Sequence, residues 1–190
     1  FVWNNVVFTV ATVCVLIATL YPLALDALSG AKITVGAPYF NAVMVPIFLA
    51  VLLLMAVAPL VPWRKANPER LRSRLLVPAT LGLAAGVLML ITAWPLHWTG
   101  PVAAALIAFV TGTIVTDYVR AVRQRRLQHP GESFLRALAR TVFGNRRHYG
   151  GMIVHLGIAI MAIGLTGSGL FRADKAVAMV PGEVVEVGGE

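Results

Sequence analysis

Five long apolar stretches constrain the fold of this chain more than any other feature. Each is long enough to cross a bilayer as a helix of about 20 residues. They lie at about 2–25, 42–61, 75–94, 102–119 and 150–171. The chain is 58% hydrophobic and 13% charged, and its mean hydropathy is +0.81, well outside the usual balance of a soluble domain. The sequence therefore predicts an all-α integral membrane protein with five transmembrane helices.

The basic residues are concentrated between these stretches. Thirteen of the sixteen Lys and Arg lie in the connections 64–74 and 120–147, whereas 26–41 and 95–101 together hold only Lys32. Such an excess is typical of cytoplasmic loops, so we expect the chain to enter from the cytoplasm, cross five times and end outside. The net charge of +8 therefore reflects membrane topology and does not indicate a nucleic-acid partner.

A short amphipathic segment at 132–143 precedes the fifth stretch. Glu132, Arg136 and Arg140 follow one another at intervals of four on one face. The apolar positions are Phe134, Leu135, Leu138 and Val142. This pattern predicts a helix lying on the membrane surface. We interpret His148, in the same basic connection, as solvated or facing lipid headgroups.

The C-terminal end differs in character from the rest of the chain. Val-rich runs at 176–180 and 184–187 flank Pro181 and Gly182, a pattern typical of a strand, a turn and a strand. We expect a transmembrane helical domain over 1–171 and the start of an extracytoplasmic β-domain over 172–190, continuing in a longer protein.

Small residues indicate where helices can approach closely. Gly82 and Gly86 in the third stretch are spaced as Gly-x-x-x-Gly, a common packing signal in membrane helices. Gly157, Gly164 and Ser168 form a comparable stripe on the fifth stretch. We expect both sets to face neighbouring helices.

His155 is the one ionisable residue between Gly150 and Phe171. A titratable group at membrane depth usually faces protein, a cavity or a cofactor. Its helix face also carries Gly151, Ala159 and Ala162, which would leave room for a flat ligand such as haem. On the residues alone, a hydrogen bond to a neighbouring helix explains His155 equally well.

Two motifs resemble those of a known family. Residues 32–41 read Lys-Ile-Thr-Val-Gly-Ala-Pro-Tyr-Phe-Asn, and 146–157 contain Arg-Arg-His-Tyr-Gly-Gly and then Val-His-Leu-Gly. With the Asn pair at 4–5 and Leu-Tyr-Pro-Leu at 20–23, they resemble the CcmF/NrfE family of cytochrome c maturation proteins. The resemblance covers essentially the whole chain and corresponds to the C-terminal membrane half of such a protein.

The resemblance implies a haem lyase, an enzyme that acts within a complex in the bacterial cytoplasmic (inner) membrane. It would attach haem covalently to the Cys-x-x-Cys-His motif of apocytochrome c on the periplasmic side. By the same resemblance, His155 is an axial ligand of a transmembrane haem b and binds its iron, with the second ligand outside this chain. Gly151, Ala159 and Ala162 would then face the haem.

The resemblance also implies partners and an orientation. The partners would be the haem chaperone CcmE, apocytochrome c with its CcmH/CcmI-type chaperones, and membrane lipid. The first residues of the chain would be cytoplasmic and its last residues periplasmic. The tryptophan-rich external haem segment of the family, its flanking histidines and a second transmembrane histidine have no counterpart here. We therefore do not expect this segment to attach haem by itself.

Two other functions are compatible with the expected topology. In a multipass transporter or permease, His155 would serve in packing or in a proton relay. Such proteins usually have broken helices or paired charges at mid-depth, and the centres of the five stretches hold no Asp, Glu, Lys or Arg. A membrane scaffold would explain the amphipathic segment but would leave His155 without a role.

Overall fold

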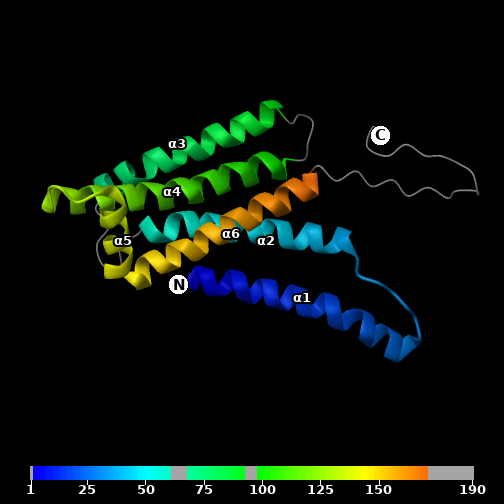
Figure 1. Ribbon diagram of the computed structural model, residues 1–190. Coiled ribbons are helices and arrows are strands. Elements are labelled where there is room, and N and C mark those ends of the chain that lie inside the picture. The colour runs from blue at the N-terminus through cyan, green and yellow to red at the C-terminus, as the bar shows by residue number, and fades with distance from the viewer. Residues whose placement is uncertain (1, 61–67, 93–97, 171–190) are drawn as a thin grey trace, which may run out of the picture.

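The computed structural model describes residues 2–60, 68–92 and 98–170, and the regular structure in these ranges is helical (Figure 1). Its elements are α1 (Val2–Ser29), α2 (Ala37–Val57), the 3-10 helix η1 (Ala58–Leu60), α3 (Pro68–Thr92), α4 (Thr99–Gln128), α5 (Phe134–Gly144) and α6 (Arg146–Leu170). By length and composition, α1, α2 with η1, α3, α4 and α6 can each cross a membrane. The predicted all-α membrane fold with five transmembrane helices is confirmed. The expected β-domain over 172–190 lies outside the described residues.

The helices extend beyond the apolar stretches that predict them. α4 continues to Gln128. The first four arginines of the second basic connection, Arg120, Arg123, Arg125 and Arg126, therefore lie on this helix and not in a loop. α3 begins at Pro68 and α2 at Ala37, again inside expected loops. The bilayer limits the length of the apolar segment, whereas backbone hydrogen bonds continue a helix into the polar region. α5 coincides closely with the amphipathic segment.

α3 and α4 approach each other along a seam of small residues. A Cβ atom added to Gly82 would lie 2.7 Å from the backbone oxygen of Ala105, and one added to Gly86 would lie 2.9 Å from Ala105 Cβ. Separations this short are essentially never seen for a real Cβ, so only glycine fits here without movement. The predicted packing role of Gly82 and Gly86 is confirmed.

The buried core lies among α2, α4 and α6. Its members are Leu52, Met55, Ala56, Ala103, Ile107, Val110, Ile114, Tyr149, Met152, Ala159 and Ala162. α1 runs along one edge of the bundle beside α2 and buries only Ala18 (Figure 1). The apolar side chains of α1 are therefore available to lipid.

One end of the bundle collects the basic residues. The start of α3, the end of α4, the whole of α5 and the start of α6 meet there, at the left of Figure 1. Glu132 holds the connection between α4 and α5, because its carboxylate accepts from Arg125 at 2.9 Å and pairs with Arg140 at 3.2 Å. The described parts of the two basic connections, 68–74 and 120–147, thus lie at the same end, as their alternation along the chain predicts.

Candidate functional site

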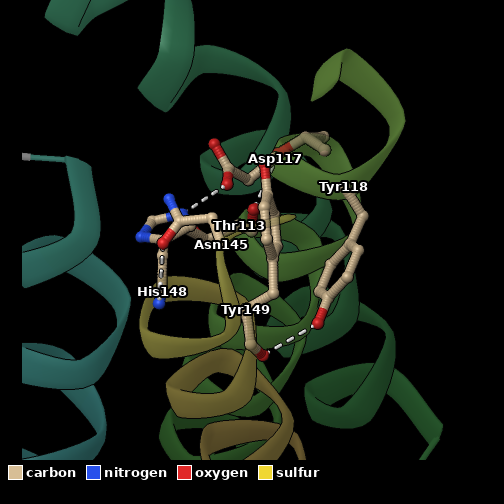
Figure 2. Close-up of polar contacts among 7 residues, drawn as sticks. Thr113, Asp117, Tyr118, Asn145, His148 and Tyr149 are labelled. Carbon is tan, nitrogen blue, oxygen red and sulfur yellow. Dashed lines mark hydrogen bonds and ion pairs between the residues drawn. The ribbon is translucent and has the colours of Figure 1, made fainter. Parts of the chain in front are cut away.

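Two polar contacts fasten α6 to α4 at the basic end of the bundle. His148 Nε2 lies 3.0 Å from Asp117 Oδ2, and the Tyr118 hydroxyl donates to the backbone oxygen of Tyr149 at 2.9 Å (Figure 2). The His148 ring also meets the Tyr149 ring edge to face, with centroids 4.8 Å apart. We call these four residues the latch. Because its two contacts involve successive residues on each helix, the latch fixes the register between α4 and α6.

The latch adds a partner to the interpretation of His148 as solvated or facing headgroups. Its side chain is 41% exposed, but the ring is engaged by Asp117, and its backbone N–H also donates to Asn145 Oδ1 at 3.4 Å. Sequence reasoning missed Asp117, which lies 31 residues earlier on another helix. A partial signal was present, since Asp117 lies near the end of the fourth apolar stretch and His148 precedes the fifth, and the topology places both on the same side of the membrane.

His155 lies about two turns along α6 from His148 and on the same face. The residue is half-buried, and its Nδ1 atom is enclosed and has no hydrogen-bond partner among the described residues. The Nε2 atom, by contrast, is accessible, and it forms no hydrogen bond or ion pair with a described residue. The interhelical hydrogen bond offered as an alternative for His155 is therefore not formed with any described residue.

The surroundings of His155 are packed on one side and open on the other. Met152 and Ala159 are buried against the neighbouring helices, and so is Ala162. Gly151 is exposed, and a Cβ atom added there would have no neighbour within 4 Å. The helix surface beside His155 is thus filled with protein around Met152 and Ala159 and is free around Gly151. The haem-facing role of Gly151, Ala159 and Ala162 stays a prediction.

The small residues on the opposite face of α6 are open in this structure. Gly157, Gly164 and Ser168 are exposed, and a Cβ atom added to either glycine would have no neighbour within 4 Å. No described helix occupies this stripe. The expectation that another helix packs there stays a prediction.

The chemistry available at His155 suits one kind of metal centre. No group of three or more His, Cys, Asp or Glu lies together in the described ranges, so a metal held by several side chains is not found there. Haem iron needs only an axial ligand from the protein, and a histidine is a usual one. An imidazole with no hydrogen-bond partner fits that requirement.

The curated proteins that this chain resembles are cytochrome c-type biogenesis proteins. The chain is 39% identical over 189 residues to the cytochrome c-type biogenesis protein CcmF of Pseudomonas aeruginosa, covering 98% of this chain and 27% of the relative. It is 32% identical to the cytochrome c-type biogenesis protein CycK of Rhizobium meliloti, covering 97% and 27%. It is 29% identical to the cytochrome c-type biogenesis protein NrfE of Haemophilus influenzae, covering 93% and 25%.

The chain thus spans about a quarter of the length of the curated relatives it matches. No protein-family model matches it, and no solved structure matches it.

Proposed function

Because the chain belongs to the CcmF family of cytochrome c-type biogenesis proteins, we propose that it forms part of a haem lyase and binds a haem b through His155. The observation that carries this proposal is the His155 imidazole. It lies at membrane depth on α6, makes no hydrogen bond to any described residue and borders an open surface. A buried polar group without a partner is costly. That cost falls on Nδ1, whereas Nε2 is accessible, forms no hydrogen bond or ion pair with a described residue and is free to coordinate a metal.

The two ring nitrogens would have different roles. Nε2 is the nitrogen that a ligand can reach, so it would bind the iron, while Nδ1 stays enclosed within the bundle. When bound, haem b would supply one-electron redox chemistry. The chain itself would position the imidazole, because the latch holds α6 in register with α4, and Met152 and Ala159, about one turn to either side of His155, are buried in the core.

The wider activity follows from the family. The lyase would join haem to the Cys-x-x-Cys-His motif of apocytochrome c, with haem delivered by a CcmE-type chaperone and apocytochrome presented by CcmH/CcmI-type chaperones. The second axial ligand would come from outside this chain. The basic end of the bundle would face the cytoplasm of a bacterial inner membrane, and the end of α6 at Leu170 would face the periplasm.

A reduced-minus-oxidised visible spectrum of the purified full protein tests the proposal. The wild type should show a b-type signal, and His155→Ala should abolish or shift it, because the substitution removes the axial ligand. His129→Ala is the matched control, since His129 is exposed just after α4 and its ring makes no recorded contact with a described residue.

Each outcome of this experiment is decisive. An unchanged signal in folded His155→Ala protein would remove His155 from the haem site. Absence of any haem signal from the wild type would contradict the proposal as a whole and favour transport or scaffolding.

A further inference from the structure

A hollow lined by arginines lies at the basic end of the bundle, away from His155. Its volume is about 510 Å³, and it opens between the ends of α3, α4 and α6. Arg74 from α3 and Arg120 and Arg123 from α4 contribute to its wall. Asp117 and His148 of the latch line it as well.

The charge of this hollow is not neutralised within the described part of the chain. None of its three arginines pairs with a carboxylate there, and Arg120 makes only a hydrogen bond to the backbone oxygen of Ser73 at 3.3 Å. Asp117 is engaged by His148 at 3.0 Å. By contrast, Arg125 and Arg140 of the same end share Glu132. The hollow therefore brings together three arginines that have no carboxylate partner among the described residues.

A second hollow of about 580 Å³ adjoins the first, and the two share Arg123 and Leu127 in their walls. The second is mainly apolar, with Val119, Val122 and Phe134 in its lining, and Arg126 also contributes to its wall. Leu127 is 75% exposed and Phe134 is 52% exposed. A molecule that places an anionic group among the arginines could thus lay an apolar chain against Val119 and Val122 of α4, beside Phe134 of α5.

We infer that these joined hollows bind one anionic phospholipid, with its phosphate among Arg74, Arg120 and Arg123 and an acyl chain along Val119, Val122 and Phe134. Guanidinium groups match the oxygens of a phosphate with paired hydrogen bonds. Basic pockets between transmembrane helices on the cytoplasmic side are suited to anionic headgroups. The apolar hollow favours a lipid over a free phosphate, because a free ion would use only the arginines. This site does not depend on haem binding at His155.

The test uses the full protein, purified, delipidated and titrated in mixed micelles with phosphatidylglycerol, with bound lipid counted by native mass spectrometry. Arg123→Gln should weaken phosphatidylglycerol binding about fivefold, the loss expected for one basic residue near a lipid surface. Arg136→Gln is the matched control. It removes the same charge from an exposed position on α5, outside both hollows, and should leave binding unchanged.

The other arms identify the ligand. Phosphatidylcholine, which has the phosphate but no net charge, and inorganic phosphate, which has no acyl chain, should both bind more weakly than phosphatidylglycerol. Equal losses in Arg123→Gln and Arg136→Gln, or no loss in either, would overturn the site. Inorganic phosphate binding as tightly as the lipid would overturn the lipid assignment.

A second substitution guards against a folding defect. Arg74→Gln, on a different helix and also exposed, should weaken phosphatidylglycerol binding by a similar factor while circular dichroism stays unchanged. Wild-type affinity in Arg74→Gln protein would count against the site.

Discussion

Two histidines on one face of α6, about two turns apart, differ in how their rings are satisfied. His148 lies at the end of the bundle, is 41% exposed and has Asp117 3.0 Å away. His155 lies deeper along the helix, is half-buried and has an enclosed Nδ1 with no partner among the described residues. The better hydrated histidine is thus the one with a partner.

If both histidines had purely structural roles, the more buried one, His155, would be expected to have the hydrogen-bond partner. The structure shows the opposite. Structural polar groups inside a membrane bundle are expected to find partners, because water cannot satisfy them there. The chain supplies such partners at the latch, where two contacts join successive residues of α4 and α6. Along the same helix pair it supplies none for His155. The contrast favours a ligand for His155 other than the described residues of the chain.

The comparison of the two histidines predicts its largest effect on haem affinity, for a substitution beside His155. Gly151→Leu should lower haem affinity about tenfold or more, because overpacking costs about 1–3 kcal/mol and the side chain would enter the open space next to the ring. Haem titration of the purified full protein, followed by its absorbance, measures the effect.

Gly157→Leu provides the control for that measurement. Gly157 is equally open but lies on the opposite face of α6, so haem affinity should stay at the wild-type value. Equal losses in the two variants would show that haem does not lie on the Gly151 side.

A smaller effect is expected at the other histidine. His148→Leu should lower the free energy of unfolding by about 1 kcal/mol, since it leaves the Asp117 carboxylate, 29% exposed, without its partner. In the double variant Asp117→Leu/His148→Leu, most of that loss should be recovered, because both polar groups are gone. Unfolding in mixed micelles, titrated with dodecyl sulfate and followed by circular dichroism, gives the four values of a double-mutant cycle. Additivity within about 0.3 kcal/mol would mean that the two side chains are not coupled.

The sequence predicts the membrane fold because the bilayer imposes a length and an apolarity that can be read directly. The five helices, the surface helix α5 and the packing role of Gly82 and Gly86 follow from local composition and spacing. The positions of the helix ends cannot be predicted in this way. The charge of the arginines from Arg120 onward indicates a loop, but backbone hydrogen bonds extend α4 beyond the apolar segment to Gln128.

Neighbour relations are the other part that the sequence does not reveal. Gly82 and Gly157 are both transmembrane glycines with small residues at helical spacing, yet only Gly82 faces another described helix. Likewise, the position of His155 marks it as unusual, but the partner of His148 depends on the register between α4 and α6. That register is a tertiary property, set where Asp117 and Tyr118 meet His148 and Tyr149.

The smallest expected effect tests whether the latch positions His155 or only stabilises the bundle. Tyr118→Phe removes the hydroxyl that donates to the Tyr149 backbone oxygen at 2.9 Å and should cost about 0.5–1 kcal/mol of unfolding free energy. The cost is at the low end for a hydrogen bond because that oxygen can still accept within α6. Tyr21→Phe, at an exposed position on α1 with no recorded contact to a described residue, should cost nothing measurable.

If the latch positions the imidazole, Tyr118→Phe should also shift the b-type absorbance of the reduced protein. A stability loss with an unchanged spectrum would restrict the latch to packing of α6 against α4.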